Sequence, residues 1–436
     1  MMVRIGARWP GIAQAVAGSA GTIGLRGLSI ASNILVASLA LRLLGADRYG
    51  QYVLLMTTAA WLAIGMLGTT EYLTQALVKV PGGAGSEQAI PLLRANLVYN
   101  AIGAAGAAVI ALLGLTGLAL VMPLDRQLVA AATILLLGSA LSQPLSMASS
   151  ALIAQGRIGT DALFKILQPL LLLAIVGGAY LLPPMPQGRM LILLSIAYAL
   201  SWLVTRACAF LLTFQGIALL HRLCSADIGP VARSAWPFLV IQIAALLSFQ
   251  TDRFLVTGFS SLAELTRYDL LSRIFTALYA VFSIPILHIW RLVGSERDGH
   301  NPDRRKVIGL YLMGSIVFWI ATTLVVMVST PLVIRLFSGN TISALPWTVT
   351  ALVGAFFLVR GTTDVLTLSL YALEQQKTLL PFIIAHGVTN VAFAAAGGAL
   401  GGINGLLIGQ IVSFVLSTLI PFLWILHHRL GKAATS

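Results

Sequence analysis

Long apolar runs separated by short polar segments cover almost the whole chain. A helix of about 20 residues crosses roughly 30 Å of hydrocarbon, and within lipid a helix satisfies all of its own backbone groups. The pattern therefore predicts an all-α, polytopic membrane protein of about twelve spans. We place them at 17–44, 50–70, 95–122, 128–154, 163–182, 190–214, 236–258, 270–290, 307–328, 347–372, 379–400 and 403–426. The second could continue past Glu71 toward Lys79, which would bring Glu71 into the membrane.

Composition and charge support this class and suggest an orientation. Of the 436 residues 58% are hydrophobic and 9% charged, more apolar than a soluble chain can bury. With the N-terminus in the cytoplasm, 16 of the 27 Lys and Arg fall on the cytoplasmic side, seven on the outer side and four within spans. This favours both termini in the cytoplasm. We attribute the net charge of +13 to this asymmetry and an anionic inner leaflet, and expect no nucleic-acid partner.

A weak internal repeat relates the two halves. Asn33 to Tyr49 and Asp252 to Tyr268 share one spacing, and further matches such as Gly177-Gly178-Ala179 with Gly397-Gly398-Ala399 recur at an offset of 219 or 220 residues. Six spans per half make both copies enter the membrane from the same side, so the repeat is parallel. We expect two six-helix bundles, 1–214 and 236–436, joined by a cytoplasmic linker at 215–235.

Polar residues of the first span fall on one helix face at steps of four, three and four. They are Thr22, Arg26, Ser29 and Asn33, and no acidic residue lies in the run from Gly18 to Leu41. A guanidinium at membrane depth costs about 2.5–3.5 kcal/mol on insertion scales, so it usually faces a protein interior or an aqueous cavity. We interpret the stripe as a cavity wall that binds substrate. Alternatively, the hydroxyls bond their own helix, Asn33 joins helices, and Arg26 extends to the headgroups.

The tenth span repeats the pattern with Arg360, Asp364, Thr367 and Tyr371. Arg360 and Asp364 can form a local ion pair that lowers the cost of insertion, or can bind substrate. Counted from the opposite side of the membrane, Arg360 lies at a depth similar to that of Arg26, so the two could converge on one anion.

Asp252 in the seventh span takes the place of Asn33 in the repeat. We expect the adjacent Arg253 to face another side of the helix, which leaves Asp252 as a candidate proton-accepting or cation-coupling group. An interhelical salt bridge or a hydrated span end would also explain it. Pairing with Arg26 is disfavoured by an axial offset of about 10 Å. Near span ends, Arg206 and Arg273 can extend to the headgroups or line the pore.

Signals for catalysis are absent from the sequence. The chain has no Gly-rich phosphate loop followed by Lys-Ser or Lys-Thr, no His-Glu-x-x-His and no Cys-x-x-Cys. We therefore expect no enzyme activity, no cofactor and no metal.

Two segments resemble a known family. The frame Arg42-Leu-Leu-Gly-Ala-Asp-Arg-Tyr-Gly-Gln-Tyr resembles the Arg-x-Leu-Gly-x-x-x-Tyr-Gly signature of Wzx-type polysaccharide flippases, and Trp236-Pro237 through Asp252-Arg253 to Tyr268 looks like the start of their second bundle. These flippases belong to the multidrug/oligosaccharidyl-lipid/polysaccharide exporter superfamily. The resemblance implies a V-shaped pair of bundles with alternating access. It also matches Arg26 to the basic cavity residues of the first helix and Asp252 to the acidic position of the seventh.

The resemblance further implies a substrate and a location. The substrate would be an undecaprenyl-diphosphate-linked oligosaccharide carried across the bacterial inner membrane for polysaccharide biosynthesis. Membrane lipids, a polysaccharide polymerase and the chain-length machinery would be the other partners. Two alternatives remain. A cation-coupled multidrug or metabolite antiporter on the same fold would be expected to carry an acid on the first helix, where this chain has Asn33. A scaffold or glycosyltransferase would be expected to show a large periplasmic loop or an acidic catalytic pair.

Overall fold

The computed structural model describes residues 10–81, 86–214, 227–286, 289, 293, 304–339, 342–343, 345–373 and 375–432, and of these it gives residues 10–23, 376, 431 and 432 as backbone only. This part of the chain is helical. The longer helices are α2 (Pro10–Trp61), α3 (Thr69–Lys79), α4 (Ile90–Val121), α5 (Arg126–Ser142), α6 (Met147–Ala154), α7 (Ile158–Tyr180), α8 (Gln187–Thr213), α9 (Gly229–Phe249), α10 (Thr251–Phe259), α11 (Leu262–Ile286), α13 (Arg304–Ser338), α14 (Trp347–Ala372), α15 (Gln376–Phe414) and α16 (Ile420–Lys432). Short 3₁₀ segments lie at η1 (Leu62–Met66), η3 (Glu87–Ala89) and η4 (Pro144–Ser146), and a π-helical segment, η6, at Val415–Leu419.

The described helices account for twelve membrane spans. Nine segments are long and apolar enough to cross a membrane, or ten if the bent pair α5 and α6 forms one span. Two of them, Gly24–Met66 with 43 residues and Lys377–Leu430 with 54, are long enough for two spans each. Their backbones leave helical geometry at Gly45 and at Gly401–Gly402, between the predicted spans. The all-α fold with twelve spans is thereby confirmed.

The second span ends in a break, after which the chain starts a new helix. Leu67 and Gly68 are both left-handed, and α3 begins at Thr69, so Glu71 lies on a separate helix with its side chain exposed. A Cβ at Gly68 would collide with the backbone of α9 at Ala235 and Leu239, so only glycine allows both the φ of +73° and this approach.

A glutamine from α9 satisfies the backbone groups that the break leaves open. Gln242 donates from Nε2 to the carbonyl of Ala63 at 2.6 Å, and its Oε1 accepts from the N–H of Gly68 at 3.2 Å. Buried backbone groups without partners are costly, so this one side chain makes the break tolerable within the bundle.

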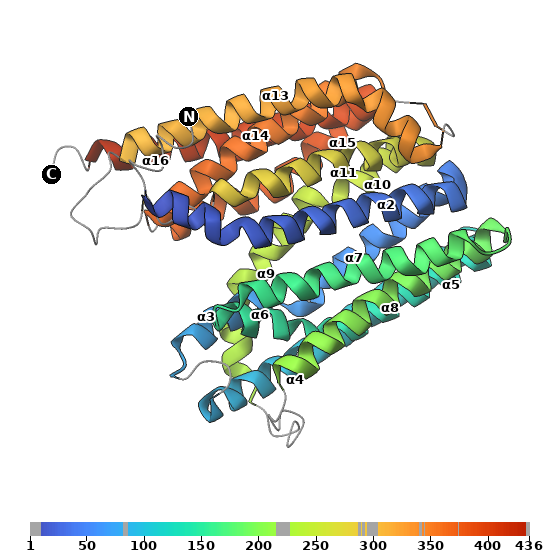
Figure 1. The fold of residues 1–436 in the computed structure, drawn as a ribbon, viewed down its shortest axis with the longest axis horizontal. Coiled ribbons are helices and arrows are strands. Elements are labelled where there is room, and N and C mark those ends of the chain that lie inside the picture. Colours follow the sequence, from blue (N-terminus) through green and yellow to red (C-terminus); the bar gives the residue numbers. More distant parts are fainter. Residues whose placement is uncertain are drawn as a thin grey trace. The chain divides into compact units, whose positions relative to one another are not determined.

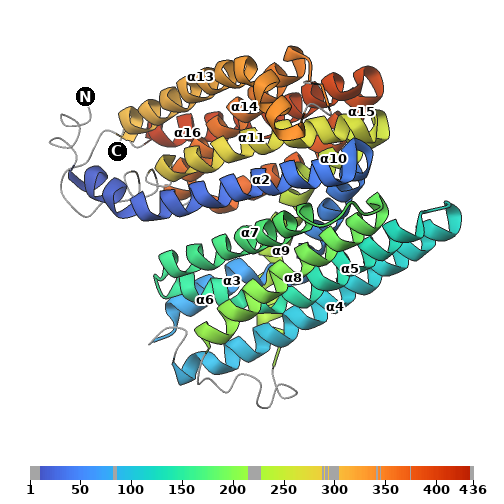
Figure 2. The ribbon, with the colours of Figure 1, turned by 45° about the vertical axis from the view of Figure 1, so that its right-hand side comes forward.

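The chain forms two compact units that differ from a simple division into halves. Unit 1 holds the chain up to Ile30, Phe254–Leu336 and Ile342–Ser436, and unit 2 holds Ala31–Arg253 and Phe337–Thr341. Unit 1 thus combines the start of α2 with the C-terminal helices, whereas α9 belongs to unit 2. Of the predicted linker 215–235, residues 215–226 lie outside the described residues, and α9 already begins at Gly229. Figures 1 and 2 show α4, α5 and α8 side by side in unit 2, and α11 beside α14 in unit 1.

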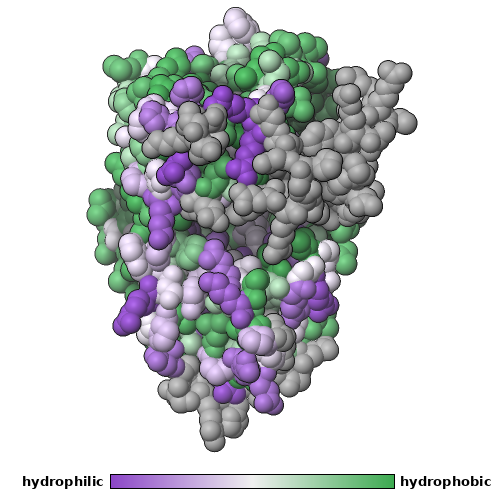
Figure 3. Space-filling view, turned by 90° about the vertical axis from the view of Figure 1, so that its left-hand side faces the viewer, coloured by the Kyte–Doolittle hydropathy of each residue, from purple (hydrophilic) through white to green (hydrophobic). Residues whose placement is uncertain are grey.

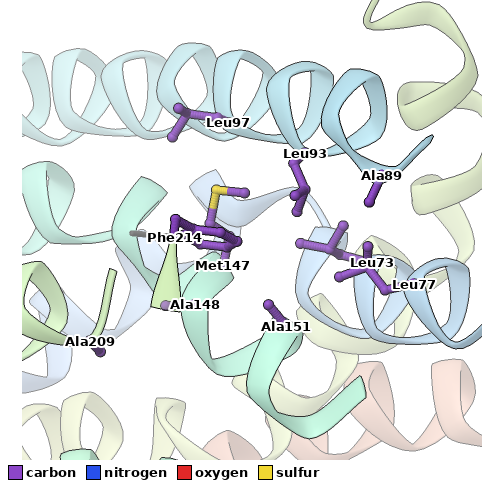
Figure 4. Close-up of a cluster of buried hydrophobic side chains, with 10 residues drawn as sticks. All are labelled: Leu73, Leu77, Ala89, Leu93, Leu97, Met147, Ala148, Ala151, Ala209 and Phe214. Atoms are coloured by element: carbon purple, nitrogen blue, oxygen red, sulfur yellow. The ribbon is translucent and has the colours of Figure 1, made fainter. Parts of the chain in front are cut away.

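An apolar cluster packs several helices of unit 2 against one another (Figure 4). Leu73 and Leu77 from α3 meet Leu93 from α4 and Met147 from α6, and all four side chains are nearly or fully buried. The further members are Ala89, Leu97, Ala148, Ala151, Ala209 and Phe214. Burial of a leucine or methionine side chain contributes roughly 1.5–3 kcal/mol, so the cluster fixes α3 and α6 against α4 and α8.

The outward faces of the long helices are apolar, as lipid requires. Leu120 on α4 and Val328 on α13 expose more than four fifths of their surface. In Figure 3, hydrophilic side chains gather on the end of the molecule that faces the viewer, and hydrophobic side chains cover the flanks. This distribution fits helices whose ends meet water and whose sides meet hydrocarbon.

Asp125 gives unit 2 a pH-dependent contact outside the spans. Its carboxylate caps α5 by accepting from the N–H of Gln127 at 3.0 Å, and it pairs with Arg48 at 2.8 Å. The Gln127 amide and then the Arg48 guanidinium lower the pKa of this carboxyl. Because the folded-state pKa is depressed, the stabilisation is present above the ordinary carboxyl pKa and is lost as pH falls through the lowered value.

We therefore expect Asp125→Asn to unfold at a lower temperature than wild type near neutral pH, and the two midpoints to converge as the pH falls through the lowered pKa of this carboxyl. Thermal unfolding of the detergent-solubilised protein over this pH range measures the difference. A difference that stays constant with pH would show that the charge of Asp125 contributes nothing.

Candidate substrate-binding site

Polar side chains form a stripe along α11 in unit 1. Its members follow at steps of three and four residues and so share one helix face: Asp269, Ser272, Thr276, Tyr279 and Ser283. Asp269 is 1% exposed and binds Nε of Arg273 through Oδ2 at 2.6 Å. The acidic end of the stripe is therefore neutralised within α11, and Arg273, a pore-lining candidate, is held in this pair.

Tyr279 connects the stripe to both charged residues of α14. Its hydroxyl donates to Oδ2 of Asp364 at 2.8 Å, and the guanidinium carbon of Arg360 lies 4.2 Å from the centre of its ring. The charge of Arg360 acts on Asp364 one helical turn away. Arg360 lies near the middle of the 26-residue α14. Tyrosine, arginine and aspartate thus form one coupled cluster in the interior of a span.

Aromatic packing holds the Tyr279 ring in place. Tyr279 stacks on Trp319 with ring centres 6.4 Å apart, and Phe357 lies 6.1 Å from Tyr279 and 5.4 Å from Trp319. The fully buried Trp319 also lies against Gly361, where a Cβ would collide with its indole Nε1. Position 361 must therefore be occupied by glycine or a very small residue. The Arg360 guanidinium packs on a Tyr279 ring that its aromatic neighbours hold in place.

Arg26 reaches the same face of α11. Its Nη1 donates to Oγ of Ser283 at 3.5 Å, and its side chain is exposed. Ser283 is one turn from Tyr279, about 6 Å along the helix. Arg26 and Arg360 thus contact neighbouring turns of α11 within unit 1, and their convergence on one anion stays a prediction.

The other members of the first-span stripe are placed less uniformly. Ser29 is half-buried in unit 1, Asn33 is half-buried in the part of α2 that belongs to unit 2, and the side chain of Thr22 lies outside the described residues. Both Ser29 and Asn33 have interaction partners. Their role in binding substrate stays a prediction.

The expectation that Arg253 cannot neutralise Asp252 was wrong. Oδ1 of Asp252 accepts from the backbone N–H of Arg253 at 2.8 Å and lies 3.4 Å from Nη1 of the same residue. The reason is local: α9 ends at Phe249 and α10 starts at Thr251, so Asp252 sits in the first turn of a new helix. A carboxylate there turns back to the free N–H groups. A coupling role for this 9% exposed residue must include Arg253.

The four arginines predicted within spans differ in charge balance. Arg253 forms an ion pair with Asp252, and the charge of Arg360 acts on Asp364. Arg26 and Arg206 have no carboxylate within ion-pair distance among the residues that the structure describes. Arg26 belongs to unit 1 and Arg206 to unit 2. Each unit therefore carries one intramembrane guanidinium whose charge an acidic side chain of the described chain does not neutralise.

Sequence reasoning missed the stripe on α11. The stripe consists of single polar residues in an apolar span, such as Asp269, Tyr279 and Ser283. One such residue by itself does not indicate a binding site. Their period of three and four is the signal that finds them, as it found the stripe of the first span. The bond from Tyr279 to Asp364 joins positions 85 apart in sequence, which no local pattern reveals.

Comparison with known proteins identifies the fold. Neither a protein-family model nor a curated protein sequence matches the chain. Among solved structures, an inward-facing multidrug resistance MATE family transporter of the MOP superfamily matches with a TM-score of 0.68 and 14% identity over 95% of both chains. The lipid II flippase MurJ in its inward closed conformation matches with a TM-score of 0.68 and 12% identity over 94% of this chain and 87% of that one.

A further MATE structure, in the straight conformation, matches with a TM-score of 0.61 and 13% identity over 97% of both chains. At these identities the likeness shows the fold alone. It is the fold of twelve membrane helices in two repeats that these transporters and the flippase share. The expected fold class is confirmed, the bundle bounds 1–214 and 236–436 stay a prediction, and the substrate is left to the chemistry of the site.

Proposed function

We propose that the chain is a flippase that carries lipid-diphosphate-linked oligosaccharide units to the periplasmic face of the bacterial inner membrane by alternating access, as a step of polysaccharide biosynthesis. The observation that carries the proposal is Arg26, an exposed arginine on a membrane-spanning helix. Among the described residues no carboxylate lies within ion-pair distance of its guanidinium. A charge in that position is costly unless it faces a cavity and has a counter-ion.

A diphosphate headgroup supplies such a counter-ion. Arginine presents several donors in a planar fork that matches phosphate geometry, and it stays charged at depth. Arg360 lies near the next turn of α11, with its own charge partly balanced by Asp364. Together they offer a site of moderate positive charge, which can bind a diphosphate and also release it. The chain adopts the fold of a lipid II flippase, among other transporters, and this supports the proposal.

One observation favours a second candidate, a cation-coupled multidrug or metabolite antiporter. Asp364 is a carboxylate near the middle of a span with a tyrosine hydroxyl beside it, which is a plausible place for a coupling cation. The MATE transporters with the same fold support this reading. Against it, Arg360 already sits beside that carboxylate, and the first span holds Asn33 and no acid.

Deleting the gene from its bacterium separates the two functions. We expect surface polysaccharide to be lost and lipid-linked oligosaccharide to accumulate, resistant to a glycosidase added to spheroplasts, whose outer membrane has been opened. Sensitivity to cationic dyes should stay at the wild-type level. Increased dye accumulation together with normal polysaccharide would reject the flippase and establish the antiporter.

A further inference from the structure

Unit 2 has its own unneutralised cation at Arg206. This residue lies on α8, its Nη1 donates to Oγ of Ser142 at 3.0 Å, and its guanidinium carbon lies 4.2 Å from the centre of the Trp202 ring. The hydroxyl and the ring orient the guanidinium, but neither cancels its charge. Because an intramembrane arginine without a counter-ion is costly, it marks a site for an anion.

Two cavities meet at this arginine, and both lie within unit 2. The larger, of about 390 Å³, extends toward α6 and α7, and the smaller, of about 310 Å³, extends toward α5 and α9. Met66, Trp202 and Arg206 line both. Small-molecule sites in proteins occupy about 300–1,000 Å³, so either cavity can hold a group the size of one sugar or a small part of a lipid.

Polar atoms of the cavity walls lack partners in the part of the chain that the structure describes. They are Nε1 of Trp202, Oγ1 of Thr205 and Oε1 of Gln143, and the Thr205 and Gln143 side chains are 4% and 3% exposed. Buried polar groups in proteins are nearly always hydrogen-bonded. These atoms have almost no accessible surface, so a ligand reaches them only after their side chains rotate, and Arg206 is the group that marks the site.

The acid that lines the larger cavity is already engaged. Asp161 accepts from Oγ of Ser149 at 2.6 Å and pairs with Nζ of Lys165 at 2.7 Å. Its charge is thus matched by a lysine, and Arg206 remains the unmatched charge of the cavity wall. One guanidinium with neighbouring N–H and O–H donors suits a monoanionic carboxylate. A diphosphate would bring at least two negative charges to one positive charge.

The rest of the lining suits a sugar. The larger cavity combines the hydroxyls of Thr70, Ser146 and Thr205 and the amide of Gln168 with the apolar surfaces of Phe164 and Trp202. A sugar presents hydroxyls that both donate and accept, together with C–H faces that pack on aromatic rings. The hydroxyls of Ser146 and Thr70 donate to the Gln143 carbonyl and to Sδ of Met66, and the Gln168 amide donates to Ser201. A sugar hydroxyl can still donate to the remaining lone pairs of these oxygens.

We propose that the Arg206 cavity binds an acidic sugar through its carboxylate, as a recognition site in unit 2 separate from the Arg26 and Arg360 site in unit 1. The inference rests on the proposed function, because it names a carboxylate-bearing sugar as part of the carried oligosaccharide. The Arg206 cavity is the larger of the two, where Arg206 holds the carboxylate and Trp202 and Thr205 donate to it or to an adjacent hydroxyl.

Purified full-length protein in detergent tests the proposal. Sodium glucuronate, glucose and sodium pyrophosphate are titrated at equal ionic strength, and thermal unfolding reports binding through the rise in midpoint. We expect glucuronate to stabilise the wild type and glucose to have at most a weak effect. Arg206→Gln should weaken glucuronate binding by at least about tenfold, since a charge-assisted hydrogen-bond pair is lost.

Two control variants distinguish a loss of glucuronate binding from a loss of the folded structure in Arg206→Gln. Thr205→Val removes a hydroxyl without a partner in the described structure, so it should leave the unliganded midpoint unchanged or raised while weakening glucuronate binding about 2- to 10-fold. Arg189→Gln removes a charge from an exposed position of the same helix and should bind glucuronate like the wild type.

Several results would overturn the proposal. These are equal stabilisation by glucose, stabilisation by pyrophosphate alone, no stabilisation by glucuronate, or full binding by Arg206→Gln. Its failure is distinguishable from that of the proposed function. Loss of surface polysaccharide on gene deletion without glucuronate binding rejects only the acidic sugar, whereas glucuronate binding with intact polysaccharide rejects the flippase and leaves the site.

Discussion

Replacing Arg26 by alanine is expected to abolish surface polysaccharide while the protein stays inserted and abundant. The side chain is exposed, and its hydrogen bond to Ser283 is long, at 3.5 Å, so little folding energy depends on it. If it binds the diphosphate through charge-assisted hydrogen bonds, its loss weakens substrate binding by about tenfold or more. Quantifying surface polysaccharide against the amount of protein in the membrane measures the effect.

Two variants serve as controls for this result. Arg335→Ala removes a basic side chain from an exposed position of α13 in the same unit and should leave polysaccharide unchanged. Arg26→Lys keeps the charge but loses the planar fork, so an intermediate phenotype is expected. Normal polysaccharide in Arg26→Ala, at wild-type protein levels, would remove Arg26 from the transport mechanism.

Arg360→Ala is expected to destabilise unit 1 by about 1–3 kcal/mol, because it removes the charge that acts on Asp364 within a span and the guanidinium over the Tyr279 ring. Removing both charges together with Asp364→Asn should recover much of this loss, since the asparagine can still accept from Tyr279. Unfolding of the solubilised protein, followed for wild type, both single variants and the double variant, gives the coupling free energy of the pair.

Tyr279→Phe provides the matched comparison. It keeps the ring under Arg360 and the packing on Trp319, and removes the hydroxyl alone, at an expected cost of about 1.5–3 kcal/mol for a hydrogen bond to a charged group. If the effects of Arg360→Ala and Asp364→Asn simply added, the two residues would not form a coupled cluster, and the site would have to be redrawn around Arg26.

The spans could be predicted from the sequence because lipid imposes one length and one polarity on every crossing segment. The two turns at Gly45 and at Gly401–Gly402, where the backbone leaves helical geometry, fall where the apolar runs end. The break at Gly68 was harder to predict, because the collision with the α9 backbone that requires a glycine there involves residues about 170 positions away.

The site could be predicted only where one helix carries the whole signal. The stripes of the first and tenth spans are periodic, and Arg26, Arg360 and Asp364 were found that way. The error at Asp252 arose from assuming one continuous helix through Gln250, where the structure starts a new one. The interaction of Arg206 with Trp202 and the bond from Tyr279 to Asp364 depend on tertiary packing or side-chain rotamers, which helical period does not encode.

The two hydrogen bonds of Gln242 have a mechanical consequence. They tie the carbonyl before the break and the amide after it to a third helix, α9. Sliding α9 along its neighbours would strip two main-chain groups of their partners at once, at a cost of about 1–3 kcal/mol for each. We therefore expect the end of the second span, α3 and α9 to move together as one rigid group in any conformational change.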